Sequence, residues 1–168
     1  TFMNKKTGQL VMKAAGRGPD AFSELIQLQM KRMYRTAYAI LQRDADAADA
    51  IQDTILTVWE ELPSLRNIEY YQTWCTRILI NRSCDLRRRR SAEIPLEEWE
   101  EPAMEDHYNL EWKEALSALE EKYRVPIELF YGQGYRIAEI SKILKLPENT
   151  VKTRISRGRK QLKRYYLE

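Results

Sequence analysis

The stretch that decides the fold is the end of the chain, KLPENTVKTRISRGRKQLKRYYLE, residues 145–168. Its first residues, through Pro147, favour a turn, and the remainder consists mainly of helix-forming residues. Four apolar residues before it have the spacing of a short amphipathic helix: Ile137, Ile140, Ile143 and Leu144. A short helix, a tight turn and a second helix form a helix-turn-helix, in which the second helix typically enters the major groove of DNA.

The predicted second helix, residues 148–165, is strongly basic. Residues 142–164 contain nine Lys or Arg and a single acid, Glu148. Such a concentration of positive charge is expected to bind phosphate with a steep salt dependence. A solvated helix and a membrane-surface helix are the alternatives, but Val151, Ile155 and Leu162 favour a small packed core. The side chains expected at base edges are Glu148, Asn149, Thr150, Lys152 and Thr153.

Composition limits the class of protein. The 168 residues suit one ordinary domain or two small ones, with 43% apolar residues, 32% charged residues and a net charge of +3. No apolar run approaches the roughly 20 residues that span a bilayer, and no secretory signal is recognisable, so we expect a cytosolic protein. Cys75 and Cys84 in one helix would lie about 13 Å apart, too far for a disulfide. With His107 as the only histidine, a zinc site is not expected.

Residues 91–109 are predicted to be a flexible acidic linker. They contain seven acids, no Lys or Arg, and two prolines, Pro95 and Pro102. The sequence therefore predicts an N-terminal extension at 1–19, a compact unit at 20–90, the linker at 91–109 and a second compact unit at 110–168.

The first unit is predicted to consist of three helices that share one core. The first begins after Asp20, the expected N-cap, and the second spans about 45–62. A loop at 62–69 then leads to a long third helix at about 70–90. In the second unit, we expect a helix at 111–122 and another at 125–131, with Pro126 in the first turn of the latter.

Two helix faces in the first unit are polar in an unusual way. Tyr70, Arg77, Asn81 and Arg88 lie within about 40° of one another on the third helix, beside the arginine run 87–90. Rings, amides and guanidinium groups suit nucleic acid, but a solvated polar face is the alternative. The second helix has an acidic face, which is either solvated or a docking surface for a basic partner: Asp46, Asp49, Asp53 and Glu60.

Three segments in this order resemble the extracytoplasmic-function (group IV) sigma factors of the sigma-70 family. DADAADAIQDTILTVWEEL (44–62) is similar to the helix that binds core RNA polymerase. YYQTWCTRILINRSCDLRRRR (70–90) is similar to the −10 helix, and YRIAEISKILKLPENTVKTRISRGRKQL (135–162) to the −35 unit. The resemblance implies an all-α fold with a three-helix region 2-like domain and a helix-turn-helix region 4-like domain.

The resemblance also implies a function. The chain would be an alternative sigma factor that binds core polymerase through the β′ clamp and β flap and recognises −35 and −10 promoter elements. It would melt the −10 region and start transcription of a stress- or envelope-type regulon. An anti-sigma factor, often membrane-anchored in this family, would control it, so the protein would be cytoplasmic or held at the inner face of the membrane.

Site residues follow by position from the same motifs. The residues expected to bind core polymerase are Asp49, Gln52, Asp53, Thr57 and Trp59. Those expected to bind the −10 element are Arg66, Asn67, Tyr70, Trp74, Arg77, Asn81, Arg87 and Arg88, with the loop 64–69 and Asn81 matching the family's pocket for a flipped base. Those expected to bind the −35 element are Arg136, Pro147, Glu148, Asn149, Thr150, Lys152, Thr153, Arg154 and Arg157.

Two positions depart from the family pattern. Ser141 stands where the family often has Ala, and its hydroxyl can bond back to its own helix. Lys145 stands where the family often has Gly, and at a turn that needs positive φ this would cost about 1 kcal/mol.

Two other functions remain as alternatives. One is a two-domain helix-turn-helix regulator whose N-terminal unit senses a ligand or dimerises. The other is a nucleic-acid enzyme, although no catalytic constellation is recognisable and no enzymatic activity is expected. No cofactor, metal or small-molecule substrate is expected either, since Asp44, Asp46 and Asp49 lack the glycine and terminal glutamate of a calcium loop.

Overall fold

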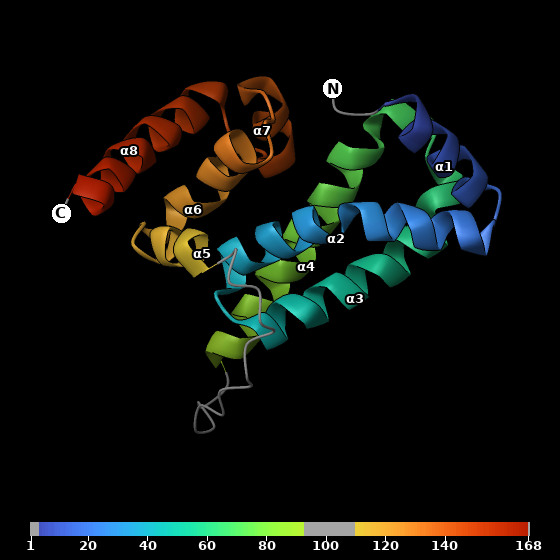
Figure 1. Ribbon diagram of the computed structural model, residues 1–168, viewed down its shortest axis with the longest axis horizontal. Helices are drawn as coiled ribbons and strands as arrows, with labels where there is room; N and C mark the ends of the chain where they lie inside the picture. The colour runs from blue at the N-terminus through green and yellow to red at the C-terminus, as the bar shows by residue number, and fades with distance from the viewer. Residues whose placement is uncertain (1–3, 93–109, 168) are drawn as a thin grey trace.

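The computed structural model describes residues 4–92 and 110–167. All regular elements in these two ranges are helical, as predicted. The helices form two groups, α1–α4 and α5–α8, which Figure 1 shows beside each other. Most of the predicted acidic linker lies outside the described residues. Its first two residues, Ser91 and Ala92, continue the helix α4.

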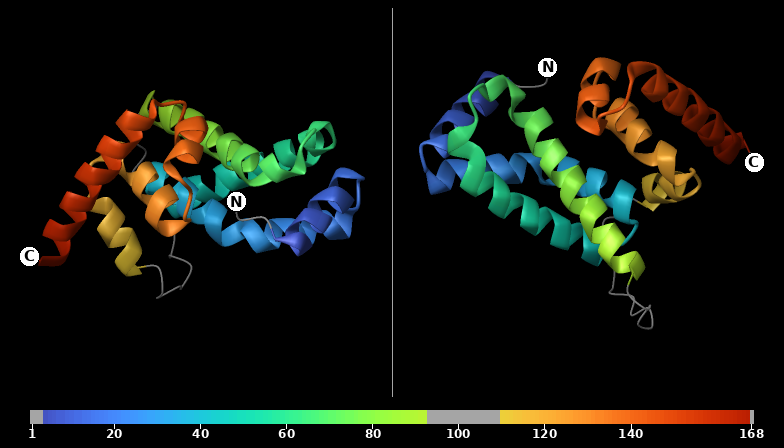
Figure 2. Two further views of the ribbon diagram at one scale, coloured as in Figure 1. Left: turned by 90° about the horizontal axis from the view of Figure 1, so that it is seen from above. Right: turned by 180° about the vertical axis from the view of Figure 1, so that it is seen from behind.

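The N-terminal group contains α1 (Lys5–Ala15), α2 (Pro19–Leu41), α3 (Asp44–Glu61) and α4 (Tyr71–Ala92). The apolar stripes of α2, α3 and α4 meet in one core, as the spacing predicts. Its most deeply buried side chains include Leu25, Ala37, Ala47, Val58, Tyr71 and Leu79. Two 3₁₀ turns, η1 (Leu62–Ser64) and η2 (Ile68–Tyr70), connect α3 to α4. Seen from behind in Figure 2, α4 crosses in front of α2, with the C-terminal group beside it.

The N-terminal extension adds a fourth helix, α1, to the three that were predicted. Leu10, Val11 and Ala14 are buried, and α1 packs on α2 and on both 3₁₀ turns. The predicted N-cap of α2 was wrong: Gly18 is the N-cap, and Asp20 lies in the first turn. Pro19 can occupy the first helical position because its missing N–H has no intrahelical partner there.

The C-terminal group contains α5 (Leu110–Ser117), α6 (Glu121–Ile127), the π turn η4 (Glu128–Gly132), α7 (Ile137–Leu144) and α8 (Glu148–Leu167). The single helix predicted at 111–122 is in fact broken between Ser117 and Glu121. Packing overrides local propensity here: Leu119 turns inward to 2% exposure, and the Arg124 Nε–H donates to the Leu116 and Leu119 carbonyls.

The position predicted for Pro126 was also wrong. Because α6 begins at Glu121, Pro126 lies inside the helix rather than in its first turn. The helix then widens, and the Gln133 N–H donates to the Glu128 carbonyl five residues earlier, at 3.0 Å. A π turn of this kind accommodates irregular packing and is frequent at functional sites.

The helix-turn-helix is present as predicted. Lys145 ends α7 in the left-handed region, with φ 54° and ψ 46°, which confirms that this turn needs positive φ. The Ser141 hydroxyl donates to the Leu146 carbonyl in the turn, at 2.5 Å, and not to its own helix as anticipated. Close packing of α8 on α6 requires Gly158, since a Cβ there would lie 2.6 Å from the Ile127 Cγ1 atom.

Candidate nucleic-acid interface

The residues expected to bind the −10 element lie along the loop 62–70 and α4. Arg66, Asn67 and Tyr70 are exposed, the last by 59%. The Asn67 side-chain oxygen accepts a hydrogen bond from the Glu69 N–H at 3.0 Å, which holds the loop and leaves its NH₂ group available to donate. Further along α4, Asn81 is exposed. Trp74 and Arg77 are half-buried.

The arginine run at the end of α4 is largely paired within the chain. Arg87 forms an ion pair with Glu121 of α6, and the Arg88 Nη2 atom lies 3.6 Å from the Asp85 Oδ1 atom. Arg90 reaches α3, where its Nη2 atom lies 3.2 Å from Asp46 and 3.6 Å from Asp49. The exposed pairs among these are weak and exchange readily for phosphate. Asp46, expected on the exposed acidic face of α3, is instead buried.

The residues expected to bind polymerase lie on α3. Asp49, Gln52 and Asp53 are exposed together on one face. Thr57 accepts a hydrogen bond from the Arg82 Nη2 at 3.1 Å, so it is partly engaged within the chain. Sequence reasoning missed Leu56, which lies one turn from Gln52 and Asp53 on the same face and is 62% exposed. The sequence could have identified Leu56, because it lies four residues after Gln52 and three after Asp53, which places all three on one helix face.

Trp59, at the end of α3, differs from the other expected polymerase contacts. It is half-buried, and its ring packs on Phe22 with 4.9 Å between centroids. The Arg17 guanidinium lies 5.1 Å from the centre of the Trp59 ring. Part of this side chain is therefore committed to joining α3 to the N-terminal helices.

The residues expected to bind the −35 element lie at the N-terminal end of α8. Glu148, Asn149, Lys152, Thr153 and Arg157 are exposed, whereas Thr150 and Arg154 are half-buried. Pro147, just before the helix, is also exposed. The arrangement presents the predicted side chains on one accessible helix end, which is the geometry that major-groove recognition requires.

Arg136 is the one expected −35 residue outside the turn and α8. It lies before α7, where its N–H and its Nε–H each donate to the Glu139 Oε1 atom at 3.1 Å. Burial disfavours the charged form of Glu139, but these hydrogen bonds outweigh it and lower the pKa of the carboxyl. Arg136 is thus held at the start of α7 while its side chain stays 70% exposed.

The structure brings the two expected DNA surfaces to a common groove, which the sequence did not predict. Asn81, Arg87 and Arg88 form one wall of this groove of about 640 Å³. The opposite wall contains residues from α6, the helix-turn-helix and its turn: Val125, Pro126, Ile143, Leu144, Lys145, Leu146 and Arg154. The groove lining is apolar and basic in the main, but Glu120 and Glu121 also contribute to it.

A buried carboxylate lies at the seam between the two groups. Glu128 of the π turn is 1% exposed and accepts two hydrogen bonds from Arg35 of α2, at 2.6 Å from Nε and 3.1 Å from Nη2. The Trp112 Nε1–H donates to the same carboxylate at 2.8 Å. Both Glu128 oxygens are therefore satisfied, as a buried charge requires. In the sequence, the feature that points to this buried charge is Glu128 itself, the only acid in the otherwise apolar and aromatic run 127–131.

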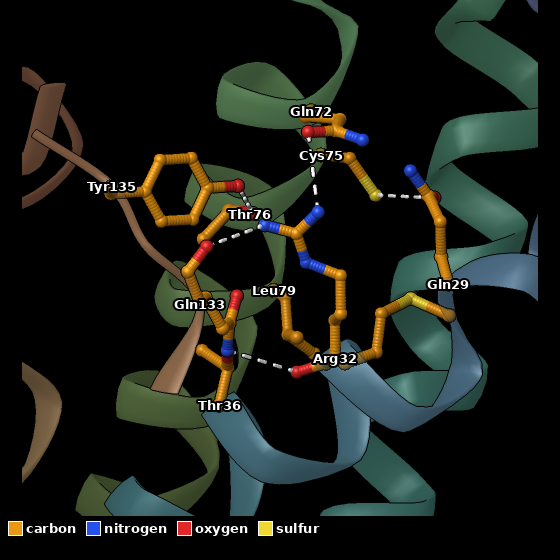
Figure 3. Close-up of a pocket in the computed structure, with 10 residues that line it drawn as sticks. Gln29, Arg32, Thr36, Gln72, Cys75, Thr76, Leu79, Gln133 and Tyr135 are labelled. Carbon is orange, nitrogen blue, oxygen red and sulfur yellow. Dashed lines mark hydrogen bonds between the residues drawn. The ribbon is translucent and has the colours of Figure 1, made fainter. Parts of the chain in front are cut away.

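Figure 3 shows the rest of the seam around a small polar pocket. The Gln133 Nε2–H donates to the Thr36 hydroxyl at 2.7 Å, and the hydroxyls of Tyr135 and Thr76 lie 3.0 Å apart. Burial raises the pKa of the Tyr135 phenol. The pocket has room for about 20 Å³, the size of one water molecule, and most of the residues around it are polar.

Neither a metal-binding cluster nor a membrane-spanning helix is found within residues 4–92 and 110–167. No group of three or more His, Cys, Asp or Glu side chains there is arranged to hold a metal ion. None of the helices in these ranges has the length and apolar character needed to cross a bilayer.

Comparison with known proteins gives a consistent answer for both groups. The family model "Sigma-70 region 2" matches residues 25–93, and "Sigma-70, region 4" matches residues 109–162. RNA polymerase sigma factor SigV of Bacillus subtilis is 30% identical over 135 residues, covering 77% of this chain and 81% of that protein. ECF RNA polymerase sigma factor SigM of Mycobacterium tuberculosis is 31% identical over 150 residues, covering 86% of this chain and 76% of that protein.

Two solved structures share the fold. CnrH, in complex with the cytosolic domain of CnrY, aligns with a TM-score of 0.72 at 23% identity over 96% of this chain and 97% of that one. The sigma factor RpoE of Bartonella quintana, in complex with the anti-sigma factor NepR, aligns with a TM-score of 0.69 at 23% identity over 85% and 94%. The two-domain regulator considered above is not favoured by these matches. The chain belongs to the extracytoplasmic-function family of RNA polymerase sigma factors, transcription initiation factors whose partners are core RNA polymerase and promoter DNA.

Proposed function

We propose that three surfaces of this sigma factor divide the work of promoter recognition. The exposed N-terminal end of α8 contacts the −35 element, with Arg136 and Arg154 beside it. The loop 62–70 and α4 bind the −10 element, and the acidic face of α3 docks on the polymerase clamp. The observation that supports this most strongly is that none of the side chains in these three sets is buried in a core.

Melting of the −10 region would follow from preferential binding of the unpaired strand. Extruding a base from a duplex costs a few kcal/mol. The exposed Arg66, Asn67 and Asn81 offer guanidinium and amide groups that pair with a base edge only after the base has left the stack. Because these contacts exist only in the melted state, they shift the equilibrium towards it.

Control by an anti-sigma factor is the second part of the proposal. Both solved relatives named above were determined with a bound protein, one of them described as an anti-sigma factor. The groove between α4 and the helix-turn-helix supports such a partner here. Its lining is largely apolar, and its basic residues outnumber Glu120 and Glu121, which suits an amphipathic acidic segment. A protein seated there would cover Asn81, Arg87, Arg88 and Arg154 together. An inducing signal would release the sigma factor from this partner, and the sigma factor would then start transcription of a stress- or envelope-type regulon.

The protein would act without chemistry of its own, as a specificity subunit of the polymerase, and would be cytoplasmic or held at the inner face of the membrane by its anti-sigma factor.

The two helical groups, α1–α4 and α5–α8, must also separate from each other when the protein binds a promoter. The −35 and −10 elements are about 25 base pairs apart, or about 85 Å at about 3.4 Å per base pair. A compact chain of this length has a radius of gyration of only about 15 Å. The seam between α2 and the π turn would therefore open on the promoter.

Reconstituted transcription tests the proposal. The protein is mixed with bacterial core polymerase and a pool of promoter-sized genomic fragments, and the transcripts are sequenced. We expect specific starts that depend on the protein and disappear in the charge reversal Asp49→Lys/Asp53→Lys. A matched reversal, Asp20→Lys/Glu24→Lys, on the exposed start of α2, should leave the starts intact.

Two results would contradict the proposal. If the protein binds duplex DNA tightly but no transcription start depends on it, the chain is a helix-turn-helix regulator and not a sigma subunit. Equal loss of starts in both charge reversals would mean that net charge, and not the α3 face, controls docking.

A further inference from the structure

Arg17 lies in the turn between α1 and α2, outside the residues that match region 2. Its φ is 68°, in the left-handed region that costs an L-residue free energy but costs glycine none. Both of its neighbours are glycine, Gly16 and Gly18, so a third glycine would fit the turn with less strain. Strain of this kind at a non-glycine residue points to a use for the side chain.

The Arg17 side chain reaches the end of α3. Its Nη1–H donates to the Trp59 backbone carbonyl at 2.8 Å, and its guanidinium lies over the Trp59 ring at 5.1 Å from the centroid. The two residues are 42 positions apart in the chain. Arg17 thus joins the α1–α2 turn to the last turn of α3.

Pro63 explains why this carbonyl needs a donor. In an α-helix the carbonyl of residue 59 accepts from the N–H of residue 63, but Pro63 has no N–H. The Leu62 N–H is engaged with the Val58 carbonyl. The guanidinium of Arg17 supplies the missing donor, and its positive charge is favourable at the negative end of the helix dipole.

The loop expected to hold the flipped base is built directly on this turn. The Leu65 N–H donates to the Leu62 carbonyl at 3.0 Å, and the Ser64 hydroxyl to the Glu61 carbonyl at 2.6 Å. Leu62 itself is 1% exposed, and α1 packs against both 3₁₀ turns of the loop. Figure 1 shows α1 beside the segment that joins α3 to α4. Any shift of the last turn of α3 therefore displaces Arg66 and Asn67.

We propose that Arg17 is a positioning residue for base capture: by supplying the donor that Pro63 lacks, it sets the end of α3 and hence the place of the loop 64–69. This inference rests on the proposed role of that loop and of Asn81. Arg17 itself need not touch DNA, and its removal should change how the unpaired strand is held without changing how the chain folds.

The substitution Arg17→Gly tests this directly. It removes the side chain and at the same time relieves the left-handed strain, so the thermal midpoint should stay unchanged. We expect holoenzyme binding to weaken about tenfold on a fork-junction DNA that has the −10 sequence single-stranded and no −35 element. Fluorescence of 2-aminopurine next to the flipped position should fall in parallel. Affinity for core polymerase should stay within about twofold.

Lys145→Gly is the matched control. Lys145 is also a long basic residue at positive φ, but it lies in the helix-turn-helix, so binding to a DNA without a −35 element should not change. Pro63→Ala supplies the second test, because an alanine at this position restores an N–H to the helical register. We expect Arg17→Gly to have a much smaller effect in the Pro63→Ala background.

Three outcomes would overturn the inference. They are fork-junction binding of Arg17→Gly within twofold of the native protein, an equal loss of core-polymerase affinity, and an undiminished effect in the Pro63→Ala background. The variants Asn67→Ala and Asn81→Ala show whether a negative result counts against the role of Arg17 or against the proposed function of the loop. If neither weakens fork binding, the loop does not capture a base. If both do and Arg17→Gly does not, only the role of Arg17 is wrong.

Discussion

The core of the N-terminal group and the seam between the two groups differ in how many polar contacts they contain. The core among α2, α3 and α4 is apolar, with Leu25, Val58 and Leu79 at most 1% exposed. The seam also contains apolar side chains, because buried residues of both groups belong to one continuous cluster. It adds polar contacts, including the hydrogen bond from Gln133 to Thr36 at 2.7 Å and that from Ser117 to Gln42 at 2.8 Å. Lys113 adds an ion pair with Asp44, at 3.1 Å.

This difference makes the seam the easier of the two interfaces to open. Opening the core would expose apolar surface at about 25 cal/mol per Å². Opening the seam also exposes apolar side chains, but its hydrogen bonds exchange for bonds to water at a net cost of only about 0.5–1.5 kcal/mol each. The buried carboxylate of Glu128 is also compatible with an opening seam. It would lose Arg35 when the two groups separate, but it would keep its hydrogen bond from Trp112, which lies in the same group. The proposed separation of the two groups on the promoter would need one interface of each kind.

The two cysteines report on the two regions separately, and here we expect the largest effect. Cys75 is 3% exposed in the core, and burial raises the pKa of its thiol to about 12. Cys84 is half-buried and lines the groove beside the seam. Burial also raises the pKa of Cys84, but Arg87 and Arg88 oppose the shift.

With a maleimide at pH 8, Cys75 should therefore react at least about a thousandfold more slowly than Cys84. Raising the pH should accelerate labelling of Cys84 first, because its thiolate becomes accessible without global unfolding. Mass spectrometry of the two peptides over time measures both rates. Equal rates would mean that core and seam open together.

Arg35→Ala should open the seam and leave the core intact. It removes the guanidinium from a carboxylate that is 1% exposed, and hydrogen bonds to charged groups contribute about 1.5–3 kcal/mol. Separation lets water reach Glu128, so we expect about tenfold or more faster labelling of Cys84, with no change at Cys75. Ser117→Ala, which removes a neutral and exposed seam contact, should change the Cys84 rate by less than about threefold. Faster labelling of Cys75 in Arg35→Ala would show that the buried pair supports the core instead.

Lys145→Gly should have the smallest effect, a gain of about 1 kcal/mol in the stability of the C-terminal group, because glycine adopts φ 54° without strain. Lys142→Gly, in the same short helix but with ordinary helical geometry, should instead lose about 1 kcal/mol. Urea titration followed by Trp112 fluorescence compares the two. If both variants lose stability, the turn is not strained.

Local patterns predicted much of the fold and of the candidate surfaces. The spacing of Ile137, Ile140 and Ile143, followed by Pro147 and a basic helix, was enough for the helix-turn-helix. The polar positions of α4 and the acidic positions of α3 lie mainly on exposed faces because helical periodicity determines which side chains turn away from a core. These features depend on residues three or four positions apart.

The errors arose where distant contacts override such patterns. No breaker stands between Ser117 and Glu121, yet the chain turns there because Leu119 packs inward and Arg124 binds the freed carbonyls. Pro63 signals the end of α3, but nothing near it reveals that Arg17 replaces its missing donor. That pairing requires the chain to return over 42 residues.

By itself, the sequence determined two helical units, their exposed polar faces and the family to which they point, because periodicity, turn chemistry and charge are local properties. Only the tertiary structure decided where the units meet. The pairing of Arg35 with Glu128, 93 residues apart, depends on two surfaces coming together in three dimensions, and no periodic pattern along the chain encodes that meeting. The joining of α1 to the loop through Arg17 has the same origin.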